Sequence, residues 1–193
     1  MPSPDELRAL LLTPEEAAAL DAPGQTDAAV LVALFEDGGR LHAVLTRRRE
    51  DLRHHPGEIS FPGGRQDFPE EDLLQTALRE AEEEVGLPPQ DVELVGALPP
   101  TPTFVSGYRI RPFVGVIEAG RAWTLQPTEV DAVLELALDD LRAGHARQRL
   151  VRRGVPFVSP TYTVGPHLVW GATARILENL FERLDPLLDA VAT

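Results

Sequence analysis

The sequence contains no cysteine and no long apolar run, and each of these absences excludes a class of protein; it also contains no lysine. Without cysteine, the chain can form neither a disulfide framework nor a metal site built on thiolates. No apolar stretch approaches the roughly 20 residues that a membrane-spanning helix needs. The N-terminal residues lack the basic flank and apolar core of a signal peptide. We therefore expect a soluble, cytoplasmic protein with no membrane partner.

The charge of the chain is strongly one-sided. All 18 basic residues are arginine, and they are set against 31 Asp and Glu residues, so that the net charge is −13. An acidic protein repels the phosphates of nucleic acid, and we expect no nucleic-acid partner. A small polyphosphate substrate would meet the same repulsion and would need metal ions and a local basic patch. Composition leaves the oligomeric state, monomer or homodimer, open.

Length and apolar patterning predict one domain over residues 1–193, with an N-terminal helical extension at 1–24 in which Thr13 caps a helix. The predicted elements that follow are a strand at 28–35, its hairpin partner at 41–45, a long loop at 47–66, a helix at 71–85, strands at 92–97, 109–117 and 132–137, a short helix at 138–144, and a C-terminal hairpin and helix within 150–193, the helix at 171–185. Strands on both sides of a central helix predict a mixed sheet between helical layers.

The second half of the predicted 71–85 helix is rich in carboxylates. On a helix Glu80 and Glu84 lie one turn apart on one face, with Glu83 beside them. Carboxylates this close repel one another, so Arg79 or a hard cation such as Mg²⁺ or Mn²⁺ must offset their charge. The alternative is a solvated acidic face, which is what most charge runs on helices are.

Two neighbouring features favour a site over a solvated face. Phe61-Pro62-Gly63-Gly64 lies just upstream, and its glycine pair permits a close approach of the backbone. Gly86 follows the acids at once and ends the helix.

This stretch resembles the box of the Nudix hydrolase family, which reads Gly, five residues, Glu, seven residues, then Arg-Glu-apolar-any-Glu-Glu-any-Gly-apolar. The second half matches at every position from Arg79 to Leu87. In the first half, counting back seven residues from Arg79 gives Glu71, whereas counting five forward from Gly64 gives Glu70. The loop is one residue longer than the general pattern, and either acid could occupy the first Glu position.

The resemblance implies an α/β fold, the Nudix-type α/β/α sandwich with a mixed central β-sheet, and hydrolysis of a phosphoanhydride with Mg²⁺ or Mn²⁺ as cofactor. Carried over by position, Glu80 and Glu84 are the principal metal ligands and Gly64 also lies at the metal. Glu83 is a further ligand or the group that orients water, and Arg79 is the salt-bridge partner that fixes one carboxylate. Such a reaction needs charge stabilisation at the phosphate oxygens and a carboxylate that can take a proton from water.

The strongest basic cluster lies upstream of the box and consists of Arg47, Arg48, Arg49 and Arg53. Arginine pairs bidentately with phosphate, so the cluster is a reasonable clamp for a polyanionic ligand. The alternative is that these arginines neutralise nearby acids such as Glu50 and Asp51.

The loop from Leu45 to Gly64 resembles the signature of the coenzyme A pyrophosphatases within the Nudix family. The positions in register are Thr46, Arg48, Arg53, Gly57 and Phe61 to Gly64. Arg49 stands where a Ser or similar residue is expected, and Glu58 stands where Gln is usual, which bears on fine specificity. The implied reaction cleaves coenzyme A to 3′,5′-ADP and 4′-phosphopantetheine. Its substrate-binding residues would be Arg47, Arg48, Arg53, Gly63, Gly64 and Tyr108.

Three residues outside the motifs are candidates with open alternatives. The adenine could stack on Tyr108 or Phe104, although core packing is the more common role for either residue. Glu129 lies in a late loop of the kind from which several Nudix enzymes take a metal ligand or catalytic base, and the alternative is an ordinary surface acid.

Three hypotheses for the function follow. The first is a metal-dependent coenzyme A diphosphatase. The second is a Nudix hydrolase for another nucleoside diphosphate compound, such as ADP-ribose or NADH. The third is a non-catalytic binding module, against which the intact Glu80, Glu83 and Glu84 argue.

Overall fold

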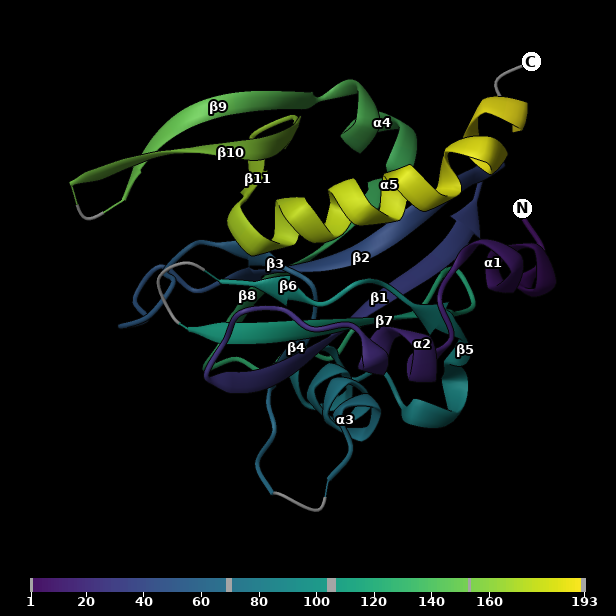
Figure 1. The fold of residues 1–193 in the computed structure, drawn as a ribbon, viewed down its shortest axis with the longest axis horizontal. Coiled ribbons are helices and arrows are strands. Elements are labelled where there is room, and N and C mark those ends of the chain that lie inside the picture. Colours follow the sequence, from purple (N-terminus) through teal and green to yellow (C-terminus); the bar gives the residue numbers. More distant parts are fainter. Residues whose placement is uncertain (1, 69–70, 104–106, 153, 192–193) are drawn as a thin grey trace.

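The computed structural model describes residues 2–68, 71–103, 107–152 and 154–191 (Figure 1). Two short helices open the chain, α1 (Pro4–Leu10) and α2 (Pro14–Ala19). Each begins with a capping box, in which Ser3 and Thr13 accept the backbone N–H of the Glu three residues later. The predicted cap at Thr13 is confirmed. In the described part of the chain, no helix is long and apolar enough to cross a membrane.

A mixed β-sheet forms the centre of the molecule. Its eight strands are β1 (Thr26–Asp37), β2 (Arg40–Arg48), β3 (Ile59–Ser60), β4 (Gly63–Arg65), β5 (Glu93–Ala97), β6 (Thr101–Pro102), β7 (Tyr108–Val116) and β8 (Val130–Ala137). The two long strands β1 and β7 run parallel, and the other pairings are antiparallel. The predicted hairpin of β1 and β2 and the predicted mixed sheet are both confirmed.

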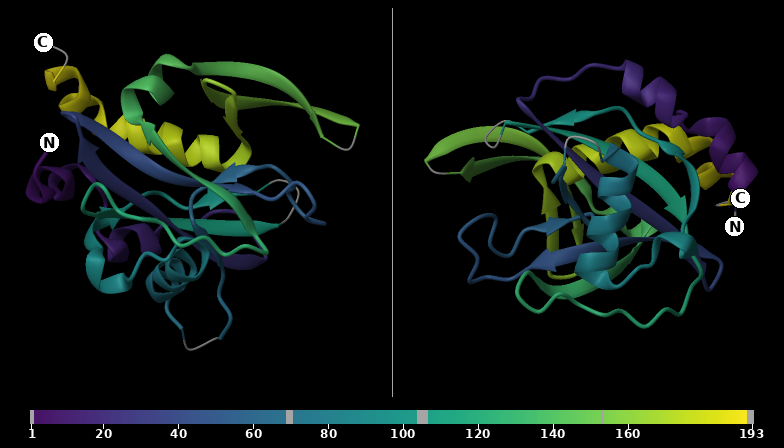
Figure 2. Two further views of the ribbon diagram at one scale, coloured as in Figure 1. Left: turned by 180° about the vertical axis from the view of Figure 1, so that it is seen from behind. Right: turned by 90° about the horizontal axis from the view of Figure 1, so that it is seen from below.

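Helices cover both faces of this sheet, as the three views show (Figures 1 and 2). Side chains alternate between the faces of β1: Val30, Val32 and Leu34 join the core with α5 (Gly171–Val191). Ala29, Leu31, Ala33 and Phe35 join the core with α3 (Leu73–Val85). Because β1 is buried on both faces, its sequence is a continuous apolar run. The α/β/α layering is as predicted.

The expected long loop at 47–66 is partly wrong. Strand β2 continues to Arg48, and the short strands β3 and β4 lie within the segment, where Thr46 pairs with Ser60 and Ala29 pairs with Gly64. β3 is only two residues long, and two of the three residues of β4 are glycines, which are depleted in strands, so local sequence carries no strand signal for either. Their pairing depends on partners far along the chain. The true loop between β2 and β3 covers residues 49–58.

The C-terminal part is larger than predicted. After α4 (Leu138–Ala143), a separate three-stranded sheet consists of β9 (His145–Arg152), β10 (Val155–Val164) and β11 (His167–Trp170). The hairpin therefore begins at His145, before the expected boundary at 150. Helix α5 also runs past the predicted end at Asp185 and includes Pro186. A proline inside a helix costs one hydrogen bond, and burial of Leu184 and Leu188 on either side of it offsets that loss.

Loss of packing beneath α5 should destabilise the whole fold. Leu180 is fully buried in the core that α5 shares with β1, so Leu180→Ala should lower the free energy of unfolding by about 2–5 kcal/mol. Glu182→Ala on the exposed side of the same helix is the matched control, and it should stay within about 0.5 kcal/mol of the wild type. Urea denaturation measures both, and equal effects would contradict this account of α5.

Candidate active site

The acidic face of α3 is packed against the sheet rather than exposed along its length. The Glu84 side chain is on the buried side of the helix and the residue is only 4% exposed. Glu80 is largely covered, whereas Glu83 and Glu82 are turned toward solvent. Ala77, Ala81 and Val85 pack in the core beneath them. The alternative of a fully solvated acidic face is therefore wrong for Glu80 and Glu84.

Two glycines of β4 allow these carboxylates to lie directly against the backbone. A Cβ atom on Gly64 would lie 2.4 Å from the Glu80 Oε1 atom. A Cβ atom on Gly63, whose φ is +154°, would lie 2.3 Å from the carbonyl oxygen of Ala29 on β1. The Gly63 contact is with fixed backbone of β1, so no side chain fits at this position. At Gly64 the space that a Cβ atom would fill is taken by the Glu80 carboxylate, so a side chain there would displace that carboxylate from β4.

Arg79 is the cation of this face. It donates a hydrogen bond to Glu71 at 2.9 Å and pairs with Glu80 at 3.1 Å, Glu83 at 3.4 Å and Asp67 at 3.5 Å. The hydrogen bond from Arg79 is the main reason that the pKa of Glu71 is lowered. Of the two acids that the motif left open, Glu71 makes the ion pair with Arg79, and Glu70 lies outside the described residues. Arg79 therefore holds several carboxylates in place at once.

Glu84 is a buried carboxylate with too few partners. Its Oε2 atom is buried and has no hydrogen-bond partner among the described residues. Burial, followed by the nearby charges of Glu129 and Glu80, raises the pKa of Glu84 to about 8, although Arg48 and the Gly63 N–H act in the opposite direction. An unpaired carboxylate oxygen next to two other carboxylates fits a divalent cation with a preference for oxygen ligands. Within the described ranges, no three His, Asp or Glu side chains already converge as a complete set of ligands.

Glu129, from the loop before β8, lies close to Glu84. This loop is attached to the end of α3, because the Gln126 N–H donates to the Glu84 carbonyl at 2.9 Å. The carboxylate of Glu129 pairs with Arg48 at 2.7 Å, and the carbonyl of Glu129 accepts from the Arg49 N–H at 3.0 Å. The structure thus brings Glu129 to the acidic face. Sequence reasoning missed the link from Gln126 to α3, for which the sequence carries no signal.

The arginine cluster is mostly engaged with acids of the protein. Arg47 pairs with Asp131 at 2.5 Å, Arg48 with Glu129, and Arg49 with Asp51 at 2.7 Å. The neutralising alternative therefore describes the contacts of these three side chains, although two of the partners come from β8 and the loop before it. Arg53 is exposed and makes no ion pair with any residue that the structure describes.

Tyr108 lies at the start of β7 and is partly buried. Its backbone N–H donates to the Thr103 hydroxyl at 2.8 Å, and its carbonyl accepts from the Thr103 N–H at 2.8 Å. The other aromatic candidate, Phe104, lies outside the described residues. A role of Tyr108 in stacking on adenine stays a prediction.

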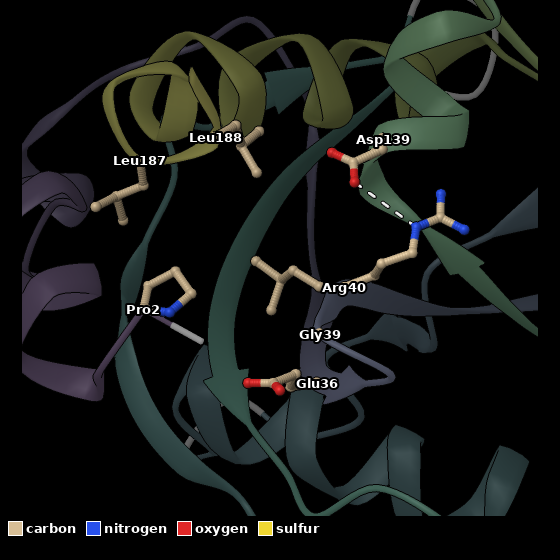
Figure 3. Close-up of a pocket in the computed structure, with 8 residues that line it drawn as sticks. Pro2, Glu36, Gly39, Arg40, Asp139, Leu187 and Leu188 are labelled. Carbon is tan, nitrogen blue, oxygen red and sulfur yellow. Dashed lines mark ion pairs between the residues drawn. The ribbon is translucent and has the colours of Figure 1, made fainter. Parts of the chain in front are cut away.

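A pocket elsewhere on the molecule does not include these residues (Figure 3). It lies between the end of α5 and the β1–β2 turn and is lined in part by Leu187, Leu188 and the ion pair between Arg40 and Asp139. The acidic face of α3 contributes nothing to it. The candidate site therefore rests on the carboxylates of α3 and not on this pocket.

The raised pKa of Glu84 predicts an unusual dependence of stability on pH. Between the ordinary pKa of a glutamate and about 8, the folded protein keeps a proton that the unfolded chain has released. The free energy of unfolding must therefore fall as pH rises through this window. The measurement is made in EDTA, which removes divalent cations. Between about pH 5 and pH 9, the free energy of unfolding of the wild type should fall by about 2–4 kcal/mol more than that of Glu84→Gln.

Urea denaturation at each pH measures this difference. Glu82→Gln is the matched control, because it removes an exposed charge from the same helix. It should follow the wild-type curve. Parallel curves for the wild type and Glu84→Gln would show that Glu84 ionises normally.

Comparison with known proteins agrees with this geometry. The family model described as NUDIX domain matches residues 25–154. The chain is 41% identical over 139 residues to a protein of Salmonella paratyphi B described as "Uncharacterized Nudix hydrolase NudL", and the match covers 71% of this chain and 72% of that protein.

Two solved structures share the fold. A MutT/nudix family protein from Enterococcus faecalis aligns with a TM-score of 0.61 at 15% identity, over 86% of this chain and 64% of that one. The NUDIX domain of Shewanella oneidensis NrtR, complexed with ADP ribose, aligns with a TM-score of 0.58 at 19% identity, over 90% of this chain and 99% of that one. Identities this low establish the fold alone. The family model and the 41% identical relative show that the chain belongs to the Nudix hydrolase family, whose members generally need divalent metal ions.

Proposed function

We propose that the chain hydrolyses the diphosphate bond of coenzyme A or a coenzyme A derivative, with Mg²⁺ or Mn²⁺, to give 3′,5′-ADP and 4′-phosphopantetheine. One observation carries the proposal. The segment that resembles the coenzyme A pyrophosphatase signature ends in β4, and Gly64 of β4 lies against the Glu80 carboxylate. The segment that would choose the substrate is therefore continuous with the one that supports the acidic face. Residues 1–193 would act as one domain.

The proposed cation site consists of Glu80 and Glu84, with Glu83 and the backbone of Gly64 at its edge. A divalent cation bound there stabilises charge on phosphate oxygens and makes water easier to deprotonate. Arg79 positions Glu80 through their 3.1 Å contact and thereby keeps the carboxylate on the side of β4. The raised pKa of Glu84 and its unpaired oxygen are the features that support a cation here.

Glu129 and Glu83 are the two alternative candidates for the carboxylate that takes a proton from the attacking water. Glu129 is close enough to Glu84 to raise its pKa, and its side chain is 39% exposed, so it can meet water. Glu83 is more exposed and is held by Arg79 at 3.4 Å. Arg48 now engages Glu129, and a phosphate that drew Arg48 away would free that carboxylate.

Substrate phosphates are proposed to bind at the arginine loop. Arg53 is the best placed of the cluster to accept a new anion, because Arg47 and Arg48 already contact carboxylates. Arg47 and Arg48 would exchange these contacts for phosphate oxygens, Gly63 and Gly64 would allow the diphosphate to approach the backbone, and Tyr108 would contact the adenine.

The competing proposal is a Nudix hydrolase for ADP-ribose or NADH. It shares the cation site and differs only in the loop. The ADP ribose bound to the NrtR domain does not favour it for this chain, since the two are 19% identical. A non-catalytic module is disfavoured by the intact Glu80, Glu83 and Glu84.

Product analysis separates these proposals. With Mn²⁺, we expect the protein to turn over coenzyme A faster than ADP-ribose or NADH and to release 3′,5′-ADP, as chromatography of the products would show. Glu84→Gln is the control and should lose most of the turnover. Faster hydrolysis of ADP-ribose than of coenzyme A would refute the coenzyme A assignment but not the diphosphatase.

A substitution at Arg53 tests the phosphate clamp. Arg53→Ala should raise KM for coenzyme A about tenfold with little change in kcat, because a hydrogen bond to a charged group is worth about 1.5–3 kcal/mol. Arg53→Lys should retain part of the affinity. Arg8→Ala, which removes an arginine paired with Glu93 on the far side of the molecule, is the control. An unchanged KM for Arg53→Ala would leave Arg53 without a role in binding.

A further inference from the structure

Charge is divided unequally between two parts of the chain. Six of the 18 arginines lie between Leu141 and Leu177, whereas none of the 31 acidic residues lies there. The remainder of the chain is therefore even more acidic than the net charge of −13 indicates. Most of this basic segment forms the three-stranded sheet β9–β10–β11.

The β9–β10 hairpin, which we call the arm, extends beyond the body of the protein. In all three views its tip lies past the N-terminal end of α5 (Figures 1 and 2). Large apolar side chains near the tip face solvent: Val151 is 69%, Val155 65% and Val158 66% exposed. Val151 and Val158 share one face of the hairpin, because they lie opposite Pro156 and Arg149, whereas Val155 is on the other face. Isolated exposed valines are common, but two on one face of a projecting hairpin are typical of an interaction surface.

One face of the arm is covered at its base and bare at its tip. Tyr162, Pro160, Val158 and Pro156 alternate along β10 and so share this face. At the base, the Tyr162 ring packs on Phe181 of α5 with centroids 5.6 Å apart.

The cross-strand partners on β9 repeat this difference. Arg147 is opposite Pro160 and pairs with Glu178 of α5 at 3.0 Å. Arg149 is opposite Val158 at the bare end, where it is exposed and, among the described residues, has no ion pair. At the base, this face of the arm therefore packs on a surface of α5 that offers both an apolar side chain, Phe181, and an acid, Glu178.

We infer that the tip of the arm docks on the acidic body of a second copy of this chain, and that the protein forms a homodimer through it. The acidic body of the second copy supplies an ion-pair partner for Arg149, and Val151 and Val158 on the same face of the arm supply the apolar contact. Each copy carries both the basic arm and the acidic body, so the arm of each copy can bind the body of the other.

Direct pairing of two arms is disfavoured. β9 is an edge strand, since the order of the sheet is β11–β10–β9, and two antiparallel β9 strands would bring arginines opposite each other. Like charges directly opposite one another destabilise a strand pair. The arm therefore contacts the body of the other copy and not its arm.

Sedimentation velocity over about 1–100 µM protein at about 50 mM NaCl tests the dimer, because charge pairs are only weakly screened at that ionic strength. We expect a dimer that weakens at about 500 mM NaCl. Arg149→Glu should raise the dissociation constant at least about tenfold through like-charge repulsion with the acidic body. The double variant Val151→Thr and Val158→Thr should do the same through loss of apolar contact, and it keeps the β-branched side chains that favour a strand.

Controls are available in the chain. Arg149→Lys keeps the charge and should leave the dissociation constant within about threefold of the wild type. Leu20→Thr changes an exposed apolar residue away from the arm and should have no effect. A protein that remains monomeric at every concentration, or a dimer that ignores both arm variants, would overturn the inference, even if the arm captured a different acidic protein.

Discussion

Burial of the Glu84 carboxylate between α3 and the glycine strand β4 is the constraint on which the rest of the site depends. A carboxylate in this position either keeps a proton or needs a cation, and burial together with Glu129 and Glu80 moves its pKa to about 8. Two arginines near this carboxylate partly compensate the negative charge of the site. Arg79 offsets the carboxylates on one side and Arg48 on the other, yet one oxygen of Glu84 keeps no partner among the described residues.

The sheet explains how such a group can be buried at all. The long strand β1 is apolar on both faces, so α3 can pack closely on it through Ala77 and Ala81. Gly63 brings the backbone of β4 close to that of β1, and the Glu80 carboxylate of α3 occupies the space beside Gly64. The stability of the layers thus holds the carboxylates in a position that they would not adopt alone.

The body and the arm of the protein differ in how their charges are paired. In the body, arginines lie next to acids, and most of the arginine loop is neutralised by Asp131, Glu129 and Asp51. In the arm, arginines accumulate with no acids between them. Under the proposed function, the first arrangement would exchange internal ion pairs for phosphates, and under the inferred docking the charge of the arm would be matched by the acidic surface of a second copy.

Local sequence determined the elements with strong periodicity and clear ends. The apolar run of β1, the cap at Thr13 and the acidic α3 that ends at Gly86 were all predictable, because neighbouring residues dictate them. The Nudix box predicted Glu80, Glu83, Glu84 and Arg79 as site residues, because its spacing is also local. Strands β3 and β4 were not predictable, since β3 is only two residues long, β4 contains two glycines, and both strands depend on pairing with distant segments. The end of α5 was missed because tertiary packing of Leu188 outweighs the local effect of Pro186.

The sequence by itself therefore determined the family, the layers and the residue types of the acidic face. Only the tertiary structure decided which acid pairs with Arg79, that Glu129 joins Glu84, and that three of the four clustered arginines are already paired. The physical reason is the range of each effect. Helix periodicity and capping act over a few residues, whereas burial and ion pairing depend on which distant segments the sheet brings together.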